Sequence, residues 1–504
     1  MISSAPASTA DLLAGLNPAQ HRAVVHAEGA LLVVAGAGSG KTRVLTHRIA
    51  HLIAEAGVSP FEILAITFTN KAADEMKTRL AALVGPVAGR MWVSTFHAAC
   101  VRILRSHAAI LGYRPSFTIY DQADSVRLTG YVVRDLDLDA KRFPARSVHA
   151  AVSAAKNELV DFETYRERAR TIYERRIAEV YRDYQQRLYS ANAMDFDDLL
   201  SVTVRVFQTS PEILDHYQRR FRHVLVDEFQ DTNRVQNELV VMLGRSHGNV
   251  CVVGDSDQSI YRFRGADIAN ILDFEKAFPN ATVELLEQNY RSTQTILDAA
   301  NAVIANNTGR RPKALWTDEG RGQPITHYHA GDERDEAAWV AEQVGRMHRS
   351  GRCRWGDVAV FYRTNAQSRV LEEELARRSV PFKVVGGTRF FDRREIRDLV
   401  AYLRVVANPS DEVSLRRIVN VPRRGVGDTS VAKLESWASA HGTNLAGALH
   451  EAAAAGLSGK ALAGVGRLAA LLDELRVMAG LADPAQPDPA ARPDPAARPD
   501  PAAR

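Results

Sequence analysis

The stretch Leu31-Leu32-Val33-Val34-Ala35-Gly36-Ala37-Gly38-Ser39-Gly40-Lys41-Thr42 joins an apolar run to a glycine-rich turn. The run predicts a buried strand, and apolar residues at helical spacing after Thr42 predict a helix. Small residues allow consecutive backbone N–H groups to point at one anion, and a helix start adds the positive end of its dipole. The stretch therefore predicts a phosphate-binding loop, in which Lys41 reaches the terminal phosphates and Thr42 holds Mg²⁺.

One position of this loop departs from the usual pattern. Ala35 stands where phosphate-binding loops carry their first glycine. A glycine-rich turn whose lysine only caps a helix is therefore the alternative interpretation. The apolar run before the loop and the helical pattern after it favour the phosphate site.

The composition is that of a globular protein, and it limits the classes of function. At about 100–200 residues for each domain, 504 residues predict three or four domains. A formal net charge of +4 neither requires nor excludes a nucleic-acid partner. The three cysteines lack the spacing of a zinc site or a disulfide framework, which fits a reducing cytoplasm. The sequence shows no export signal and no membrane-spanning apolar run, so we expect a cytoplasmic protein without a membrane partner.

Polar residues follow two more predicted strands, over residues 62–68 and 91–94. The residues at the two strand ends are Phe68, Thr69 and Asn70, and Thr95, Phe96 and His97. Because the carboxyl ends of parallel strands line the ligand crevice of a doubly wound sheet, we expect these groups in one crevice. Hydroxyl, amide and imidazole groups beside phenylalanine suit phosphate contacts and base stacking. A core position for either phenylalanine is an equal alternative.

Charged helical patterns replace the strand signal over residues 112–192. This change predicts an inserted helical domain. Its basic and acidic residues nearly balance, so a solvated helix face is the default interpretation and DNA contact is the bolder one.

Two adjacent acids follow the apolar run Val224-Leu225-Val226. A strand that ends in this way would place Asp227 near the Mg²⁺ held by Thr42. Glu228 would then be free to orient and deprotonate an attacking water. Acids that only cap a helix are the alternative, but the phosphate loop earlier in the chain favours the paired interpretation.

A third polar segment follows the strand predicted over residues 249–253. It places Gln258 a few residues before Tyr261, Phe263 and Arg264. An amide close to rings and guanidinium groups can join a nucleotide sensor to a surface that stacks bases and binds phosphates. A further strand ends at the pair Tyr290-Arg291.

These motifs form one ordered series, and in this order they resemble bacterial superfamily 1 DNA helicases of the UvrD, PcrA and Rep type. The matching segments are residues 17–20, 35–42, 66–76, 94–98, 194–199, 226–236, 253–266 and 286–293. The resemblance implies an α/β fold, with a RecA-like P-loop motor domain that carries a helical insertion. An incomplete second RecA-like domain with a helical insertion of its own would follow.

The resemblance also implies an activity. The chain would be an ATP-dependent DNA helicase and translocase that moves 3′→5′ on single-stranded DNA. It would unwind partly duplex DNA in repair or replication, with ATP and Mg²⁺ as cofactors and with protein partners unknown. A small-molecule kinase or another P-loop enzyme is a disfavoured alternative, because the motifs after the phosphate loop have no role in it.

Hydrolysis is assigned by resemblance to residues from four of these segments. Lys41, Thr42, Asp227 and Glu228 would bind and hydrolyse ATP, with Thr42 and Asp227 on the metal. The γ-phosphate would be contacted by Gln258 and Arg291.

The rest of the ATP site lies around the loop. Gln20 would read the adenine edge, since an amide offers both a donor and an acceptor, and Tyr290 would stack on the base. The loop itself contributes Ala35, Gly36, Ala37, Gly38, Ser39, Gly40 and, at its exit, Arg43.

Single-stranded DNA would cross the strand ends. By resemblance its contacts are Phe68, Thr69, Asn70, Thr95, His97, Tyr261, Phe263, Arg264, Arg363 and Asn365. Phe263 stands where many relatives carry tryptophan, and we expect the smaller ring to stack more weakly.

The expected domain organisation follows from these patterns and from the same resemblance. A loose arm would occupy residues 1–11, and the first motor domain residues 12–111 and 193–287. The inserted helical domain would span residues 112–192. The second motor domain, with a strand over residues 357–362, would span residues 288–387, and its helical insertion residues 388–480.

The C-terminal part departs from the family pattern. The late Thr-x-His-x-x-Lys-Gly-Leu-Glu-like segment and the later arginine-bearing segment are absent, and residues 481–504 are a proline-rich repeat that we expect to be extended or disordered. We therefore expect a C-terminally truncated relative, with a frame-shifted copy or one half of a split protein as alternatives. The alternative function is an ATP- and single-stranded-DNA-binding module with little or no unwinding.

Overall fold

The computed structural model describes residues 12–307, 310, 312–385 and 393–481. They form two units. The first comprises the described residues up to Arg321 and those from Val400 onward, and the second spans Gly322–Leu399. The expected arm over residues 1–11 and nearly all of the expected tail lie outside the described residues. In the described part of the chain, no helix combines the length and the apolar character needed to cross a membrane.

The first unit is built on a six-stranded sheet with the order β3-β2-β6-β7-β1-β8. Every neighbouring pair is parallel. The strands are β1 (Leu31–Ala35), β2 (Ile63–Thr67), β3 (Trp92–Thr95), β6 (His223–Val226), β7 (Val250–Gly254) and β8 (Thr282–Leu286). The predicted α/β fold with a parallel sheet is confirmed.

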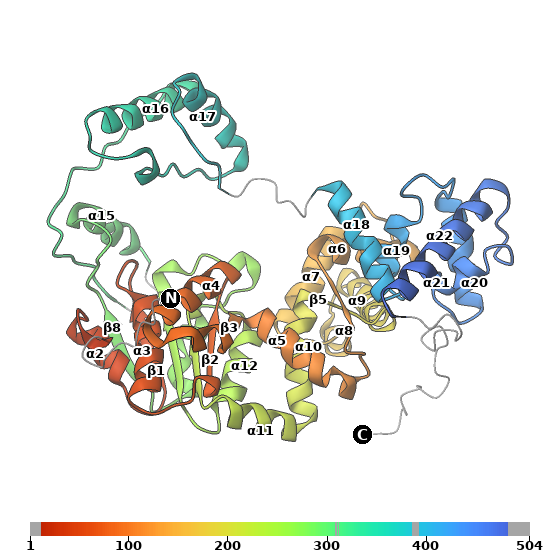
Figure 1. Cartoon of the computed structure of the whole chain (residues 1–504), viewed down its shortest axis with the longest axis horizontal. Helices are drawn as coiled ribbons and strands as arrows, with labels where there is room; N and C mark the ends of the chain where they lie inside the picture. Colours follow the sequence, from red (N-terminus) through yellow and green to blue (C-terminus); the bar gives the residue numbers. More distant parts are fainter. Residues whose placement is uncertain (1–11, 308–309, 311, 386–392, 482–504) are drawn as a thin grey trace. The chain divides into compact units, whose positions relative to one another are not determined.

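Helices cover both faces of this sheet (Figure 1). One face packs against α2 (Pro18–Val25), α3 (Lys41–Ala54) and α4 (Asn70–Val84). The other face packs against α5 (Phe96–His107), α10 (Phe196–Thr209), α11 (Pro211–Arg220) and α12 (Arg234–Gly244). Burial on both faces explains why the central strands read as continuous apolar runs rather than as alternating ones.

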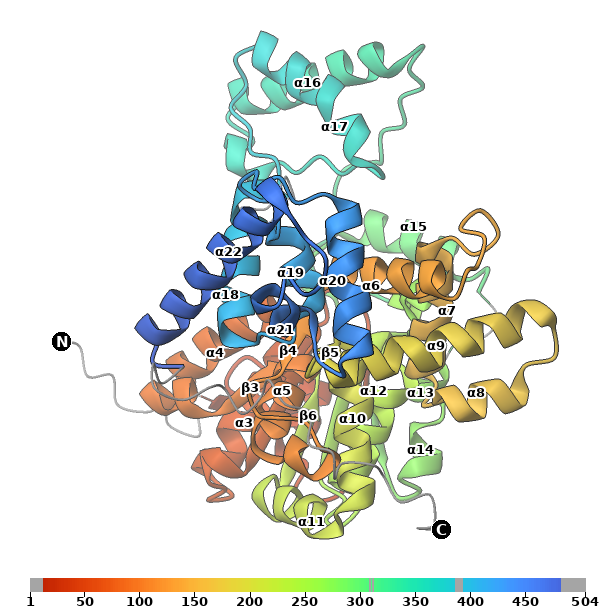
Figure 2. The ribbon, with the colours of Figure 1, turned by 90° about the vertical axis from the view of Figure 1, so that its right-hand side faces the viewer.

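The region between β3 and β6 contains the inserted helices. They are α6 (Gln122–Asp135), α7 (Ala145–Asn157), α8 (Phe162–Arg168) and α9 (Ile172–Ser190), and they share a separate core. The two short strands β4 (Thr118–Tyr120) and β5 (Ala193–Asp195) lie side by side in parallel at the base of the insertion (Figure 2). The sequence predicted neither of these strands, because three residues are too few for a periodic signal.

Further helices flank β8 and form the C-terminal part of the chain. Two helical turns, α13 (Ala269–Leu272) and α14 (Phe274–Ala277), precede β8, and α15 (Gln294–Ile304) follows it. The C-terminal helices are α18 (Arg394–Ala407), α19 (Glu412–Ile418), α20 (Asp428–Ala440), α21 (Leu445–His450) and α22 (Gly459–Met478). They form their own core, and Asp411 joins it to the insertion by accepting a 2.7 Å hydrogen bond from the Tyr120 hydroxyl.

The second unit contains α16 (Glu333–Arg349) and α17 (Asn365–Arg377). The strand expected over residues 357–362 is wrong. Trp355–Asp357 is a short 3-10 helix, residues 358–362 form no ladder, and Phe361 is 93% exposed. An apolar run becomes a strand only when a neighbouring strand satisfies its N–H and C=O groups, and none of the described residues of this unit lies in a strand.

Candidate active site

The phosphate loop lies between the end of β1 and the start of α3. Gly38 and Gly40 have positive φ angles of 70° and 88°, which residues with a side chain rarely adopt. A Cβ atom on Gly38 would lie 2.5 Å from Asn289 Nδ2 and 2.8 Å from Arg291 Cβ. Glycine is therefore required here on two counts, and the loop leaves its N–H groups at the positive end of α3.

The acids at the end of β6 lie beside this loop. The Thr42 hydroxyl donates a 3.3 Å hydrogen bond to Asp227 Oδ2, and Lys41 Nζ lies 3.6 Å from Glu228 Oε2. Burial, and then the charge of Glu228, raise the pKa of Asp227 to about 6. The same two causes raise the pKa of Asp231 to about 6. The structure thus brings the loop and both acids together, and a cation placed there would stabilise the ionised carboxylates.

The oxygens of Thr42 and Asp227 fit Mg²⁺. A hydroxyl and a carboxylate are hard oxygen donors, and Mg²⁺ in phosphate sites keeps several waters and substrate oxygens as its other ligands. The described residues contain no group of three His, Cys, Asp or Glu side chains that could hold a metal by themselves. A protein contribution of two oxygens is therefore consistent with a metal that arrives with a nucleotide.

Glu228 has a strained backbone. Its φ of 51° lies in the left-handed region, which costs a non-glycine residue about 1–3 kcal/mol. Its N–H donates to Asp227 Oδ1 at 3.0 Å, and its carboxylate accepts from Gln230 Nε2 at 3.0 Å. The side chain is 36% exposed, so this carboxylate reaches solvent while its neighbour Asp227 is buried.

Gln20 and Tyr290 lie at the loop. The buried Gln20 amide donates to the Ser39 carbonyl at 2.8 Å and accepts from the Asn17 N–H at 3.1 Å. Asn17 also donates to the Tyr290 hydroxyl at 2.9 Å, and the Tyr290 N–H donates to the Gly38 carbonyl at 3.0 Å. Tyr290 is 46% exposed, so it is accessible for the predicted stacking on a base.

Arg43 and Arg291 differ in how they relate to the loop. Arg43 is exposed and donates to the Ala14 carbonyl at 3.4 Å. Arg291 is also exposed, but its Cβ lies against Gly38, and its N–H donates to Asn289 Oδ1 at 2.8 Å. Only Arg291 is therefore anchored beside the centre of the loop.

One cleft of about 530 Å³ connects the acids to the predicted DNA surface. It is lined by Thr42, Thr67, Phe68, Thr69, Ala72, Glu75, Asp227, Glu228, Gln230, Asp231, Asp257, Gln258, Ile260 and Tyr261. The parallel strands β2, β6 and β7 supply most of these residues at their carboxyl ends. Asp227 and Glu228, the predicted sensor Gln258 and three predicted DNA contacts, namely Phe68, Thr69 and Tyr261, therefore share one cavity.

Three aromatic rings form a row at the edge of this cleft. The ring centroids of Phe68 and Tyr261 are 5.2 Å apart, and those of Tyr261 and Phe263 are 6.0 Å apart. Phe68 is half-buried and Phe263 is 77% exposed, so neither is a core residue. For Phe96 the core alternative is confirmed, since its side chain is buried in the sheet core. The side chain of Arg264 lies outside the described residues.

Three of the predicted polar contacts have structural roles as well. Thr69 caps α4 and Thr95 caps α5 with their hydroxyls, and Thr95 also lies 3.5 Å from Asn70 Oδ1. Burial lowers the pKa of His97, so its ring is neutral at neutral pH. These residues therefore offer neutral donors and acceptors rather than charges.

Sequence reasoning missed Phe196 as a member of this surface. It is 48% exposed at the first position of α10, and its ring meets that of His97 edge-on at 5.6 Å. The sequence did carry one signal for it. Phe196 directly follows the capping residue Asp195, a position at which the packing of an amphipathic helix does not require an apolar side chain, so an aromatic residue there indicates another role.

Arg363 and Asn365 belong to the second unit. Both are exposed, at or just before the start of α17. The Arg363 N–H donates to Gln367 Oε1 at 2.9 Å. The two side chains therefore share one exposed helix start.

Comparison with known protein families gives two matches that together cover most of the chain. Residues 16–279 match the family described as UvrD/REP helicase N-terminal domain, and residues 285–455 match the UvrD-like helicase C-terminal domain.

Three curated relatives show the same similarity. The ATP-dependent DNA helicase PcrA of Bacillus subtilis is 51% identical over 450 residues, 89% of this chain and 61% of that protein. The ATP-dependent DNA helicase UvrD1 of Mycobacterium tuberculosis is 54% identical over 491 residues, 94% of this chain and 63% of that protein. PcrA of Staphylococcus aureus is 50% identical over 449 residues, 89% of this chain and 61% of that protein. The chain thus spans a little over three fifths of the length of these relatives.

Proposed function

The chain belongs to the UvrD/REP helicase family, and from this premise we propose that it hydrolyses ATP to move 3′→5′ along single-stranded DNA. Partly duplex DNA would be the substrate that it unwinds, in repair or replication in the cytoplasm. The observation that carries the proposal is the single cleft that joins Asp227 and Glu228 to Phe68 and Tyr261. A cavity shared by hydrolytic acids and stacking rings allows nucleotide and nucleic acid to act on one another.

The nucleotide half would work through charge and position. The N–H groups of the loop and the Lys41 ammonium bind the phosphates, and Arg291 adds positive charge beside the loop. Glu228 accepts a proton from the attacking water, because its carboxylate reaches solvent. Its Oε2 lies 3.6 Å from Lys41 Nζ, so this base is close to the ammonium group that binds the phosphates. Thr42 and Asp227 would hold Mg²⁺, which neutralises phosphate charge when bound.

The nucleic-acid half would work through stacking. Rings at the spacing of Phe68, Tyr261 and Phe263 accept successive bases without regard to sequence, because every base has a π-face. The neutral groups of Thr69, Asn70 and His97 would contact the backbone. Arg363, which is exposed on the second unit, is a further proposed DNA contact.

ATP hydrolysis by the 504-residue chain, with and without single-stranded DNA, tests the proposal. We expect stimulation by DNA and its loss in Glu228→Gln with nucleotide binding retained. Activity that persists in Glu228→Gln identifies a contaminant, and retained binding without stimulation contradicts the motor. Substrates with 3′ and 5′ overhangs then test polarity, and unwinding from the 5′ overhang alone contradicts the proposed direction.

A binding role without unwinding is the second candidate. The observation that favours it is the absence of strands among the described residues of the second unit, where Phe361 is 93% exposed. Binding of ATP and single-stranded DNA without strand separation supports this candidate, and separation of a duplex excludes it.

A further inference from the structure

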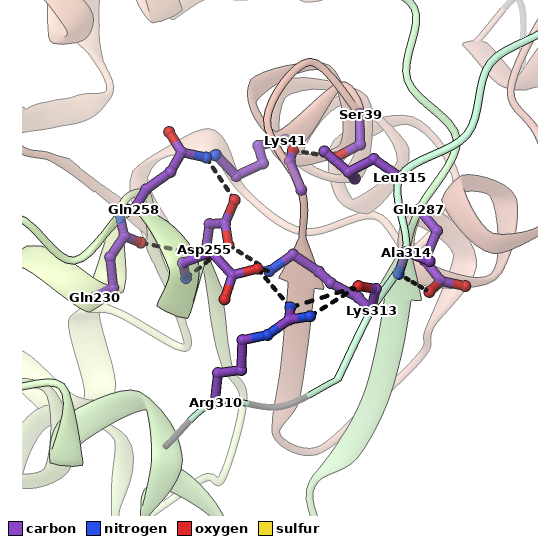
Figure 3. Close-up of polar contacts among 12 residues, drawn as sticks. Ser39, Lys41, Gln230, Asp255, Gln258, Glu287, Arg310, Lys313, Ala314 and Leu315 are labelled. Carbon is purple, nitrogen blue, oxygen red and sulfur yellow. Dashed lines mark hydrogen bonds and ion pairs between the residues drawn. The ribbon is translucent and has the colours of Figure 1, made fainter. Parts of the chain in front are cut away.

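A buried lysine, Lys313, contacts Asp255 in the segment that follows β7 (Figure 3). The Lys313 side chain is 2% exposed, and its Nζ lies 2.6 Å from Asp255 Oδ1. It also forms an ion pair with Asp257 Oδ2. An ammonium group is buried at this depth only when carboxylates compensate for its lost hydration, and here two do so.

Asp255 uses both oxygens to connect Lys313 to Gln258. Oδ1 accepts from Lys313, and Oδ2 accepts from Gln258 Nε2 at 2.6 Å. Because a carboxylate can only accept, the amide end that faces Asp255 must be the NH₂ group. The Gln258 carbonyl oxygen and its second N–H are therefore directed away from Asp255.

The backbone of Asp255 is also tied to the hydrolytic acid. Its N–H donates to Gln230 Oε1 at 2.9 Å, and Gln230 Nε2 donates to Glu228 Oε2 at 3.0 Å. A displacement of Asp255 would therefore disturb both Gln258 and Glu228.

The segment that carries Lys313 rests on the phosphate loop. The Ala314 N–H donates to Glu287 Oε1 at 2.9 Å, just after β8. Leu315 packs so closely on Gly36 that a Cβ atom there would lie 2.1 Å from Leu315 Cδ2. Lys313 therefore comes from a segment anchored to the same loop that would bind the phosphates (Figure 3).

We propose that Lys313 is a positioning residue: it holds Asp255, which orients the Gln258 amide toward the γ-phosphate. The inference rests on the proposed function, because it assigns Gln258 to that phosphate. Lys313 itself touches no nucleotide. Its effect on turnover is exerted through the direction of one amide group.

Steady-state hydrolysis by Lys313→Met, which keeps side-chain length without charge, is the first test. We expect kcat to fall about tenfold to a hundredfold, the range typical of residues that orient a catalytic group, while KM for ATP changes less than about threefold. Lys313→Arg, which keeps a cation, should recover part of kcat. Lys276→Met, at an exposed lysine, is the matched control and should leave kcat unchanged. An unchanged kcat in Lys313→Met overturns the inference.

The ratio of affinities for ATPγS and ADP gives a second readout that needs no turnover. Wild type should favour ATPγS, and Lys313→Met and Gln258→Ala should reduce the ratio by the same factor, with no further loss in the double variant. Additive losses overturn the inference.

A second variant covers the case in which Lys313→Met does not fold. Asp255→Asn must then reduce the preference for ATPγS by the same factor as Gln258→Ala. If the wild type hydrolyses no ATP, the proposed turnover is refuted, but the ratio of affinities for ATPγS and ADP still tests the inference. A wild-type ratio of one overturns the inference directly.

Discussion

Phe263 is the most exposed ring of the row at the cleft, and its contribution can be isolated. Stacking of a base on an aromatic ring contributes about 1–3 kcal/mol. We expect Phe263→Ala to weaken single-stranded DNA binding by about fivefold to 150-fold, measured by fluorescence anisotropy of a labelled oligonucleotide. Phe263→Trp should bind more tightly than wild type because its ring is larger.

Phe61→Ala is the matched control for this prediction. Phe61 is an exposed phenylalanine just before β2, at the opposite edge of the sheet from the cleft. Its loss should leave DNA affinity unchanged. Equal weakening in both variants would show that Phe263 acts through general stability rather than through stacking.

At the scale of single residues, sequence reasoning placed the loop and its acids because spacing along parallel strands determines which residues meet. Lys41, Thr42, Asp227 and Glu228 lie together as predicted. Lys313 was not predicted, because a lysine preceded by arginine and proline carries no periodic signal and reads as a solvated charge. Burial of such a group depends on partners far away in the sequence.

Between elements, Lys156 of α7 joins the inserted helices to the start of α10. Its Nζ lies 2.7 Å from Asp195 Oδ2 and 2.8 Å from Asp198 Oδ1, and all three side chains are buried. Lys156→Met would leave two carboxylates without a cation, so we expect a loss of about 3–5 kcal/mol in the free energy of unfolding. Urea denaturation measures it. Lys276→Met, which removes an exposed pair, should cost less than about 1 kcal/mol, and an equal loss in both variants would contradict the prediction.

The amino end of β6 carries a pH-dependent group. Burial, and then the charges of Arg48 and His247, lower the pKa of His223 to about 4, below its unfolded value of about 6.5. Between these values the unfolded state binds the extra proton, so stability falls as pH falls. At pH 5 we expect His223 to cost about 1–2 kcal/mol after allowance for solvent screening.

His223→Gln isolates this effect. The melting temperature of wild type should fall further between pH 7 and pH 5 than that of the variant. Buried acids with raised pKa values, such as Asp198 at about 7, stabilise the fold as pH falls, and they are common to both proteins. Parallel pH profiles for the two proteins would exclude a role for His223.

Elements were predictable where their signal is local. The strands of the main sheet follow from apolar runs bounded by polar residues, and six of them formed as expected. The run over residues 357–362 has the same local character but no ladder among the described residues. Strand formation is decided by a partner, and a single sequence window does not contain that partner.

At the scale of the whole molecule, the site draws on residues far apart in the chain. Thr42 meets Asp227, Asn17 meets Tyr290 and Lys313 meets Asp255. All of these contacts form at the carboxyl edge of one sheet, where the crossovers of parallel strands collect their loops. Because Phe68 and Tyr261 line the cleft at this edge, we expect a change in nucleotide contacts there to reach the aromatic row.

This shared edge predicts coupling between the two ligands. Phe68 and Tyr261 line the cleft together with Asp227 and Glu228, so we expect a nucleotide that moves the acids to move the rings as well. With Glu228→Gln to prevent turnover, we expect ATPγS to change single-stranded DNA affinity by about fivefold to 150-fold. Linkage requires DNA to change ATPγS affinity by the same factor, which titration in both directions measures. Tyr261→Ala should reduce this factor while leaving ATPγS affinity without DNA unchanged, and equal DNA affinity with and without nucleotide would contradict a motor built on one cleft.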